Sequence, residues 1–211
     1  MRTPSPNVVL GSVHINVTVF AVIPDYVKSI NVYDGAGGVR LYGTSLEGIE
    51  VQTNAGNIRL VNVSANAANL TDEAGDIRIT GGNFTTLDLV AKAGSVIVSS
   101  TSVASLGVID SAGDVKVSQV NVSDAVIEDS AGNIGLSDVL GDVNATAKAG
   151  NIEVFLGEKY NVVYYLTTDA GDIDINLLPS LHVTVSLPGV MASPPVIYAE
   201  AKVGSVKVNY V

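Results

Sequence analysis

The segment Ala55-Gly56-Asn57-Ile58-Arg59-Leu60 returns nineteen residues later as Ala74-Gly75-Asp76-Ile77-Arg78-Ile79, and this repetition decides the fold. The shared pattern is Ala-Gly, then Asn, Asp or Ser, then Ile or Val, any residue, and Leu, Ile or Val. It occurs ten times, with outlying copies that begin at Leu10 and Val203. Its glycines step by 19 residues from Gly37 to Gly132, and the later steps are 18, 21 and 33. A fixed short period indicates a stack of equivalent units.

Each unit carries apolar residues two positions apart, such as Ile58 with Leu60 and Ala68 with Leu70, which is the spacing of β-strands. One unit is too small to enclose a core, whereas stacked units pair each strand with its equivalent about 4.8 Å away. The sequence therefore predicts an all-β fold, a single-stranded parallel β-solenoid (β-helix). We expect about ten coils of roughly 19 residues with irregular end caps, forming a rod roughly 40 Å long.

The repeat spacing also predicts the domain organisation. We expect a single β-solenoid domain over residues 1–211, with an N-terminal cap at 1–36, regular coils at 37–175, and a C-terminal cap and closing coil at 176–211. Most tyrosines and prolines fall towards the two ends, which is typical of capping segments. The scarcity of aromatic residues in the regular coils predicts a narrow core of small aliphatic side chains.

Composition and charge exclude several classes of protein. Hydrophobic residues make up 47% of the chain and mean hydropathy is +0.38, but the longest apolar runs, residues 19–23 and 162–166, are far shorter than a spanning helix of about 20 residues. A net charge of −10 argues against nucleic acids and anionic membranes as partners. The absence of cysteine excludes disulfides, zinc thiolates and cysteine nucleophiles, and we expect no cofactor.

The glycine of each repeat stands directly before a predicted strand, where we expect a corner with a left-handed backbone that glycine adopts at little cost. The Asn, Asp or Ser that follows it is expected to bond to local backbone at the same corner. The predicted structural corners are Gly37, Gly56, Gly75, Gly94, Gly113, Gly132, Gly150, Gly171 and Gly204.

Three residues after each corner glycine, side chains are expected to face outward and to stack coil upon coil. This column begins with Arg40, Arg59 and Arg78, which form a candidate anion-binding stripe. The alternative is a solvated face that nearby carboxylates such as Asp72 and Glu73 neutralise.

Carboxylates gather in two later coils, at Glu153, Asp169, Asp172 and Asp174. Oxygen-rich clusters suit Ca²⁺, so these residues form a candidate calcium site, and paired carboxylates also serve glycoside chemistry. The alternative is an ordinary solvated acidic surface. No catalytic residue is predicted, because the sequence holds no nucleophile elbow, no phosphate loop and no aromatic subsites around a sugar cleft.

Six Asn-x-Ser/Thr sequons mark candidate glycosylation sites on a surface protein. The alternative is that Asn, Ser and Thr are abundant in solenoid turns. The sequon asparagines are Asn16, Asn62, Asn69, Asn83, Asn121 and Asn144.

The repeats resemble those of a family of bacterial and archaeal domains described as adhesins, which read Ser/Ala-Gly-Asp/Asn-Ile-x-Val/Leu. Residues 200–208 look like the closing repeat of that family, and the resemblance covers roughly residues 29–211. It implies a β-solenoid, usually outside the cytoplasm, with a largely unassigned role and no catalytic motif. Bactofilin-like polymers, which are also short parallel solenoids, are a second resemblance.

We therefore expect a non-enzymatic adhesion or interaction protein of the cell surface or envelope, with a protein or a cell-surface glycan as its partner. One alternative is a self-assembling, bactofilin-like solenoid that forms homo-oligomers through its end caps. Another is a carbohydrate-binding or polysaccharide-acting β-helix protein. The expected location is extracellular or in the cell envelope, after removal of a leader. The alternative is cytoplasmic, because no long apolar leader segment follows Met1.

Overall fold

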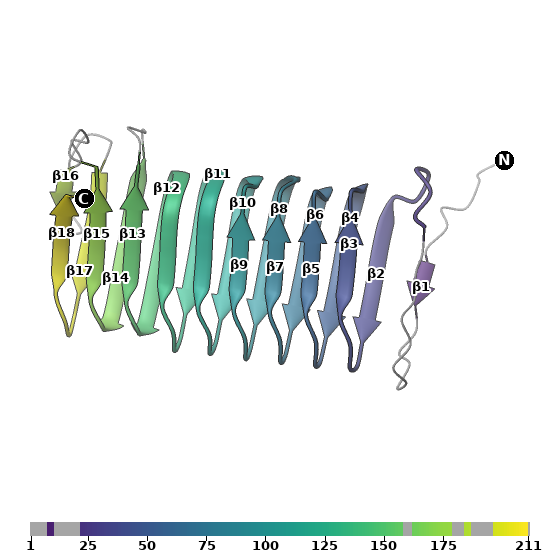
Figure 1. The fold of residues 1–211 in the computed structure, drawn as a ribbon, viewed down its shortest axis with the longest axis horizontal. Helices are drawn as coiled ribbons and strands as arrows, with labels where there is room; N and C mark the ends of the chain where they lie inside the picture. The colour runs from purple at the N-terminus through teal and green to yellow at the C-terminus, as the bar shows by residue number, and fades with distance from the viewer. Residues whose placement is uncertain (1–7, 11–21, 158–161, 179–183, 187–195, 211) are drawn as a thin grey trace.

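The computed structural model describes residues 8–10, 22–157, 162–178, 184–186 and 196–210, which form eighteen β-strands and no helix. All the strands belong to one continuous sheet in which the pairings are parallel, wound into a rod (Figure 1). The predicted all-β parallel solenoid is confirmed. The described residues form no helix with the length and apolarity that a membrane crossing requires.

The strands are β1 (Val8–Leu10), β2 (Ser29–Asp34), β3 (Val39–Tyr42), β4 (Ser45–Thr53), β5 (Ile58–Val61), β6 (Ser64–Asp72), β7 (Ile77–Thr80), β8 (Asn83–Ala91), β9 (Val96–Ser99), β10 (Ser102–Asp110), β11 (Val115–Asp129), β12 (Ile134–Ala149), β13 (Ile152–Leu156), β14 (Val163–Ala170), β15 (Ile173–Leu177), β16 (Thr184–Ser186), β17 (Val196–Ala201) and β18 (Val206–Tyr210).

Each regular coil consists of one short and one long strand, and each pairs with its equivalent in the next coil. Ile58 of β5, for example, pairs with Ile77 of β7, nineteen residues on. The nine corner glycines from Gly37 to Gly204 therefore span about eight turns. The copy that contains Gly11 lies outside the described residues, apart from Leu10 in β1.

The coil has three faces. Face 1 carries the short strands β3, β5, β7, β9, β13, β15 and β18, together with the first four residues of β11 and of β12. The long strands bend early. In β4 the amides of Glu47 and Gly48 both donate to the carbonyl of Lys28, at 2.6 and 3.2 Å, which interrupts the alternation of buried and exposed residues. We call the part of each long strand before this bend face 2 and the part after it face 3.

The core is a set of columns of inward-facing aliphatic side chains. One column at the start of face 1 exposes no surface at all (0%) and consists of Ile58, Ile77, Val96, Val115, Ile134, Ile152 and Ile173. Burial of each such side chain contributes about 1.5–3 kcal/mol relative to exposure. The expectation of a core without rings was wrong at two places. Phe84 and Tyr164 are both buried, and the Tyr164 hydroxyl donates to the carbonyl of Val139.

The corner glycines stack directly on one another. A Cβ on Gly56 would lie 1.2 Å from the carbonyl oxygen of Gly37, and for each of the next seven corners the same distance is 1.5–2.1 Å. Seven of the nine have φ between 134° and 158°, whereas Gly37 and Gly132 do not have a positive φ. The close approach of successive backbones is therefore the requirement that eight of the nine glycines share.

The positive φ expected at the corner glycines is confirmed at seven of them, and a left-handed helical backbone also occurs six residues further on. At that position of successive coils, φ is near +50° in non-glycine residues such as Asn62, Ser100 and Asp138. It is also positive at Gly43 and Gly81. Asparagine and aspartate tolerate this conformation better than most residues. The chain thus turns out of face 1 at a second corner, which the repeat pattern did not reveal.

The polar residue after each corner glycine forms a ladder between coils. Asn57 Oδ1 accepts from the Asp76 amide at 2.8 Å, Asp76 Oδ1 accepts from the Ser95 amide at 2.9 Å, and the same bond recurs in later coils. The expectation of a local bond was wrong, because the side chain reaches the equivalent residue of the next coil. The ladder therefore fixes the register of the stack.

The ends are built from the same pairings. β2, within the predicted N-terminal cap, pairs with β4, while β17 and β18, within the predicted C-terminal cap, pair with β14 and β15. Tyr165 and Tyr198 stack at 4.8 Å between ring centroids across β14 and β17. The division into caps and regular coils stays a prediction.

Candidate functional site

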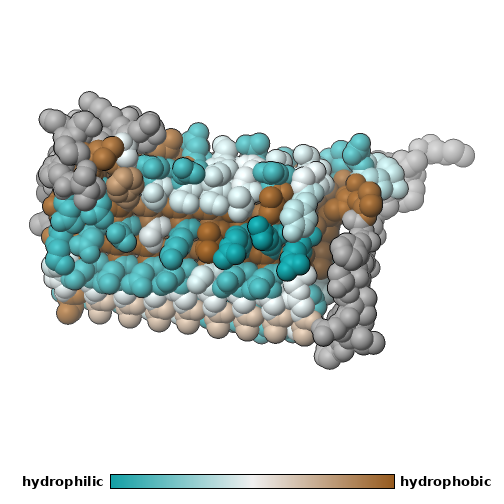
Figure 2. Space-filling view, viewed as in Figure 1, coloured by the Kyte–Doolittle hydropathy of each residue, from teal (hydrophilic) through white to brown (hydrophobic). Residues whose placement is uncertain are grey.

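The arginine stripe lies on face 1, where Arg40, Arg59 and Arg78 occupy paired positions on β3, β5 and β7. Each follows a buried inward residue, so its guanidinium group projects outward, and Arg40 and Arg59 are exposed. Neighbouring strands place these charges about 4.8 Å apart at the backbone. Figure 2 looks onto face 1 and shows strongly hydrophilic side chains gathered over these three strands. Lys116, two coils beyond Arg78, extends the same column.

The stripe has no ionic partner within the described part of the chain, since none of its guanidinium groups is within 4.0 Å of a carboxylate oxygen. The alternative that Asp72 and Glu73 neutralise it was wrong. Asp72 is fully buried and faces the core, whereas Glu73 pairs with Lys92. Stacked like charges are mildly unfavourable, so the stripe is a surface on which an anion would be stabilised.

Arginine is concentrated on this stripe. The chain has four arginines, of which three are Arg40, Arg59 and Arg78. Lysines serve the described ion pairs elsewhere, for example Lys28 with Glu47 at 3.3 Å. The planar guanidinium group binds carboxylates and phosphates through two parallel hydrogen bonds, which lysine cannot do. The residue type and the spacing together suit a ligand with several anionic groups in a row.

The predicted calcium cluster does not form. Asp169 pairs with Lys202 at 2.8 Å, and Lys207 lies 3.4 Å from Asp172 and 3.9 Å from Asp174. Among the described residues, no three His, Cys, Asp or Glu side chains are close enough together to hold a metal ion. Glu153 approaches only the Asn176 amide, at 3.4 Å. The sequence pattern did not reveal the two lysines, because they come from a coil 33 residues further along the chain.

Three buried carboxylates were also missed. Asp72, Asp110 and Asp129 stand at the ends of β6, β10 and β11, point into the solenoid and are 0–1% exposed. In each, Oδ1 accepts from the backbone amide two residues on, at 3.0–3.2 Å, which closes the turn before the corner glycine. The sequence contained a signal for this burial, because side chains alternate along a strand and each of these residues lies two positions after an inward-facing residue such as Leu70.

The second oxygen, Oδ2, has no hydrogen-bond partner in any of the three carboxylates. Burial is the main reason that the pKa of each lies above its ordinary value, although the turn amides oppose the rise. The effect is largest at Asp129, where burial and the neighbouring Asp110 raise the pKa to about 6. These groups are closed off from any substrate, so they affect stability and not surface chemistry.

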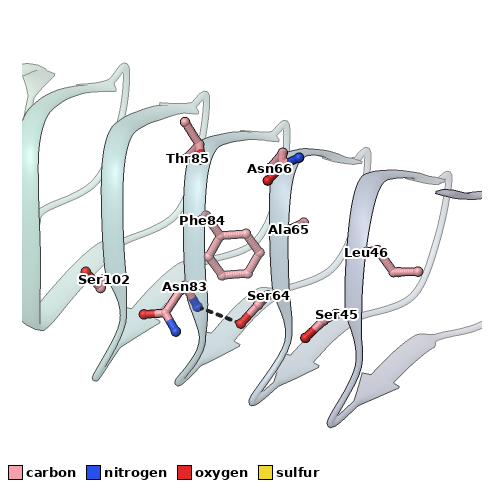
Figure 3. A pocket seen from close by; sticks show the side chains of 9 residues that line it. All are labelled: Ser45, Leu46, Ser64, Ala65, Asn66, Asn83, Phe84, Thr85 and Ser102. Atoms are coloured by element: carbon pink, nitrogen blue, oxygen red, sulfur yellow. Dashed lines mark hydrogen bonds between the residues drawn. The ribbon is translucent and has the colours of Figure 1, made fainter. Parts of the chain in front are cut away.

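A shallow depression of about 340 Å³ lies on face 2 (Figure 3). It forms where Ala65 stands between the larger Leu46 and Phe84 in one column of paired residues. Its rim consists of hydroxyl and amide groups, among them Ser64, whose Oγ accepts from the Asn83 amide at 3.2 Å. No ionisable side chain lines it, so the depression offers no acid–base chemistry.

Five of the six sequon asparagines lie in the described residues, and all five are exposed, namely Asn62, Asn69, Asn83, Asn121 and Asn144. Asn16 lies outside the described residues. None of the five is on face 1, since Asn62 is at the corner that ends it and the other four are on long strands or the equivalent parts of β11 and β12.

Comparison with known proteins gives one match. The family model described as Toastrack DUF4097 matches residues 9–137, which is more than half of the chain. No curated protein and no solved structure matches. The matched region contains face 1 from Arg40 to Lys116, and the family description names no adhesin.

Proposed function

The chain belongs to the Toastrack DUF4097 family, a repeat domain of unknown function, and from this premise we propose that it is a non-enzymatic interaction protein of the cell surface or envelope. In this proposal the rod adheres to an anionic cell-surface glycan through face 1. The carboxylates considered for polysaccharide chemistry support a non-enzymatic role, because three of the four are paired with lysines.

The observation that carries the proposal is the arginine stripe. Three guanidinium groups stand in consecutive coils, point out of the same face and have no carboxylate partner among the described residues. Each can hold one carboxylate or sulfate group, and a glycan that runs along the rod can engage all three. The whole chain carries a net charge of −10 and so repels long polyanions, which means that a short anionic stretch of glycan fits better than nucleic acid.

The test is binding of an oligouronate, a short carboxylated sugar chain, measured by isothermal titration calorimetry. We expect the triple variant Arg40→Gln, Arg59→Gln, Arg78→Gln to bind about tenfold or more weakly, since each exposed charge pair contributes up to about 1 kcal/mol. Binding to the unchanged protein should also weaken as salt rises.

The matched control is a variant with the same charge change, Lys28→Gln, Lys92→Gln and Lys202→Gln, which removes three lysines that already have carboxylate partners. It should bind the oligouronate like the unchanged protein. Equal losses in the two variants would show that only net charge matters, and an unchanged affinity in the triple arginine variant would refute the stripe.

A second candidate is end-to-end self-assembly, favoured by the outer edge of β18. Val206 and Val208 occupy inward columns but are 38% and 40% exposed, whereas their partners Ile173 and Ile175 are fully buried. Among the described strands, β18 pairs only with β15, and β3 at the other end of face 1 pairs only with β5. A strand of a second copy that meets the outer edge of β18 would therefore continue the stack in the same parallel sense.

We rank assembly second because Lys207, which stands between Val206 and Val208 on β18, puts a charge on this edge strand, and edge charges disfavour pairing with a second copy. Light scattering tests it. Rods that lengthen with protein concentration, and that Val208→Lys abolishes, support assembly, whereas a monomer at all concentrations removes it.

A further inference from the structure

Two groups of asparagines in the chain differ in what their side chains do. Asn57, Asn133 and Asn151 belong to the ladder on face 1, where each side-chain oxygen accepts from the backbone amide of the next coil. The five sequon asparagines that the structure describes are exposed, and none of them has a side-chain hydrogen bond within the described part of the chain. The first group is needed for the stack, while the second has amides that are free to react.

The two groups also differ in the residue two positions further along the chain. Two residues after each ladder asparagine comes the outward column of face 1, which holds Arg59, Gly135 and Glu153 in these coils and no hydroxyl residue. Two residues after each sequon asparagine stands the Ser or Thr that the sequon requires, such as Thr85 after Asn83. The sequons thus fall on asparagines outside the ladder, and the three ladder asparagines carry none, although both groups are exposed.

The placement is uneven around the rod. Asn62 lies at the corner after β5, while Asn83 and Asn121 lie on face 2 at paired positions with Ser102 between them. Figure 3 shows that the Asn83 side chain leaves the strand in a different direction from the buried ring of Phe84. Asn69 and Asn144 project from face 3. Glycans at these positions would cover faces 2 and 3 and leave the arginine stripe bare.

We propose that the protein is N-glycosylated at the sequons of faces 2 and 3, and that face 1 is kept free of glycan as the binding face. The inference rests on the export that the proposed function requires. The donor is an oligosaccharide linked to a lipid through phosphate. The Asn Nδ2 forms a bond to the anomeric carbon, the bond from that carbon to the phosphate oxygen breaks with its electron pair, and the amide proton passes to a base of the transferase.

The experiment is peptide mass spectrometry of the full chain purified from the organism that encodes it. We expect peptides containing Asn69, Asn83 or Asn121 to carry a mass increment of whole sugar residues. Peptides containing Asn57 or Asn133 should carry none. Unmodified asparagine in all five described sequons would overturn the proposal.

A matched pair of variants separates enzymatic glycosylation from other attachment of sugar. Thr85→Ala removes the sequon of Asn83 and should abolish the increment there, whereas Thr86→Ala, at the next residue, retains the sequon and should leave it unchanged. An increment that survives Thr85→Ala also overturns the proposal. Oligouronate binding is measured on unglycosylated protein from a host without the transferase, so the absence of glycan and the failure of the stripe are distinguishable.

Discussion

Replacing the buried Asp129 by asparagine should stabilise the protein at alkaline pH. The Asp129 carboxylate is 1% exposed, and its Oδ2 has no partner. In Asp129→Asn the side-chain oxygen can still accept from the Ala131 amide, as Oδ1 does at 3.0 Å, while the buried charge disappears. The variant also relieves the repulsion between Asp129 and Asp110, its paired neighbour on β10.

The size of the effect follows from the pKa of Asp129, which rises from 3.8 to about 6 on folding. That difference corresponds to about 3 kcal/mol. Solvent near this corner screens part of it, so we expect Asp129→Asn to gain about 1–2 kcal/mol at pH 8. For a chain of this length the gain corresponds to about 2–8 °C in Tm.

The pH dependence has a definite sign. Because the folded pKa lies above the unfolded value, the contribution of Asp129 to stability is fully present below pH 3.8 and is lost as pH rises through about 6. Thermal unfolding followed by circular dichroism between pH 4 and 8 should therefore show a smaller loss of Tm on alkalinisation in Asp129→Asn than in the unchanged protein.

The control is Asp124→Asn, which removes an exposed carboxylate from the same strand, β11. It should reproduce the pH dependence of the unchanged protein. The reasoning is refuted if Asp129→Asn lowers Tm at pH 8, or if its pH dependence equals that of the control.

Two further pairs of substitutions test the corner and the ladder beside it. Gly94→Ala places a Cβ 2.1 Å from the Gly75 carbonyl oxygen and should cost more than about 4 kcal/mol in urea unfolding, whereas Gly107→Ala, whose Cβ meets only a flexible side chain at 2.6 Å, should cost far less. Asn133→Ala removes the acceptor for the Asn151 amide and should cost about 1–2 kcal/mol, which Asn133→Ser should partly restore, because Ser95 Oγ accepts in the same way from the Asp114 amide at 3.4 Å. Equal costs within either pair would contradict these accounts.

The solenoid could be predicted because the sequence pattern that specifies it repeats at a fixed period. Glycines nineteen residues apart and inward aliphatic pairs such as Ile58 and Leu60 specify a coil and its strand pairing without any knowledge of tertiary structure. Contacts between coils were less accessible. The reach of Asn57 to the Asp76 amide depends on how closely successive corners stack, and local turn chemistry suggested a different bond.

The candidate site was predicted only in part. The outward position of Arg40, Arg59 and Arg78 followed from the alternation of inward and outward side chains along a strand. The carboxylates beside these arginines could not be predicted in the same way, because Asp72 turns inward at the end of β6 and Glu73 pairs with a lysine one coil away. Charges on a solenoid are arranged by coil stacking, so neighbours along the chain were a poor guide to neighbours in space.

The measurement that tests the binding face most directly is nuclear magnetic resonance of the arginine side chains during titration with the oligouronate. The chain has four arginines, so the Nε–Hε signals of Arg40, Arg59 and Arg78 can be assigned with single variants. The account predicts that these three signals shift together with one dissociation constant. Shifts confined to other basic residues, or no shift at saturating ligand, would contradict it.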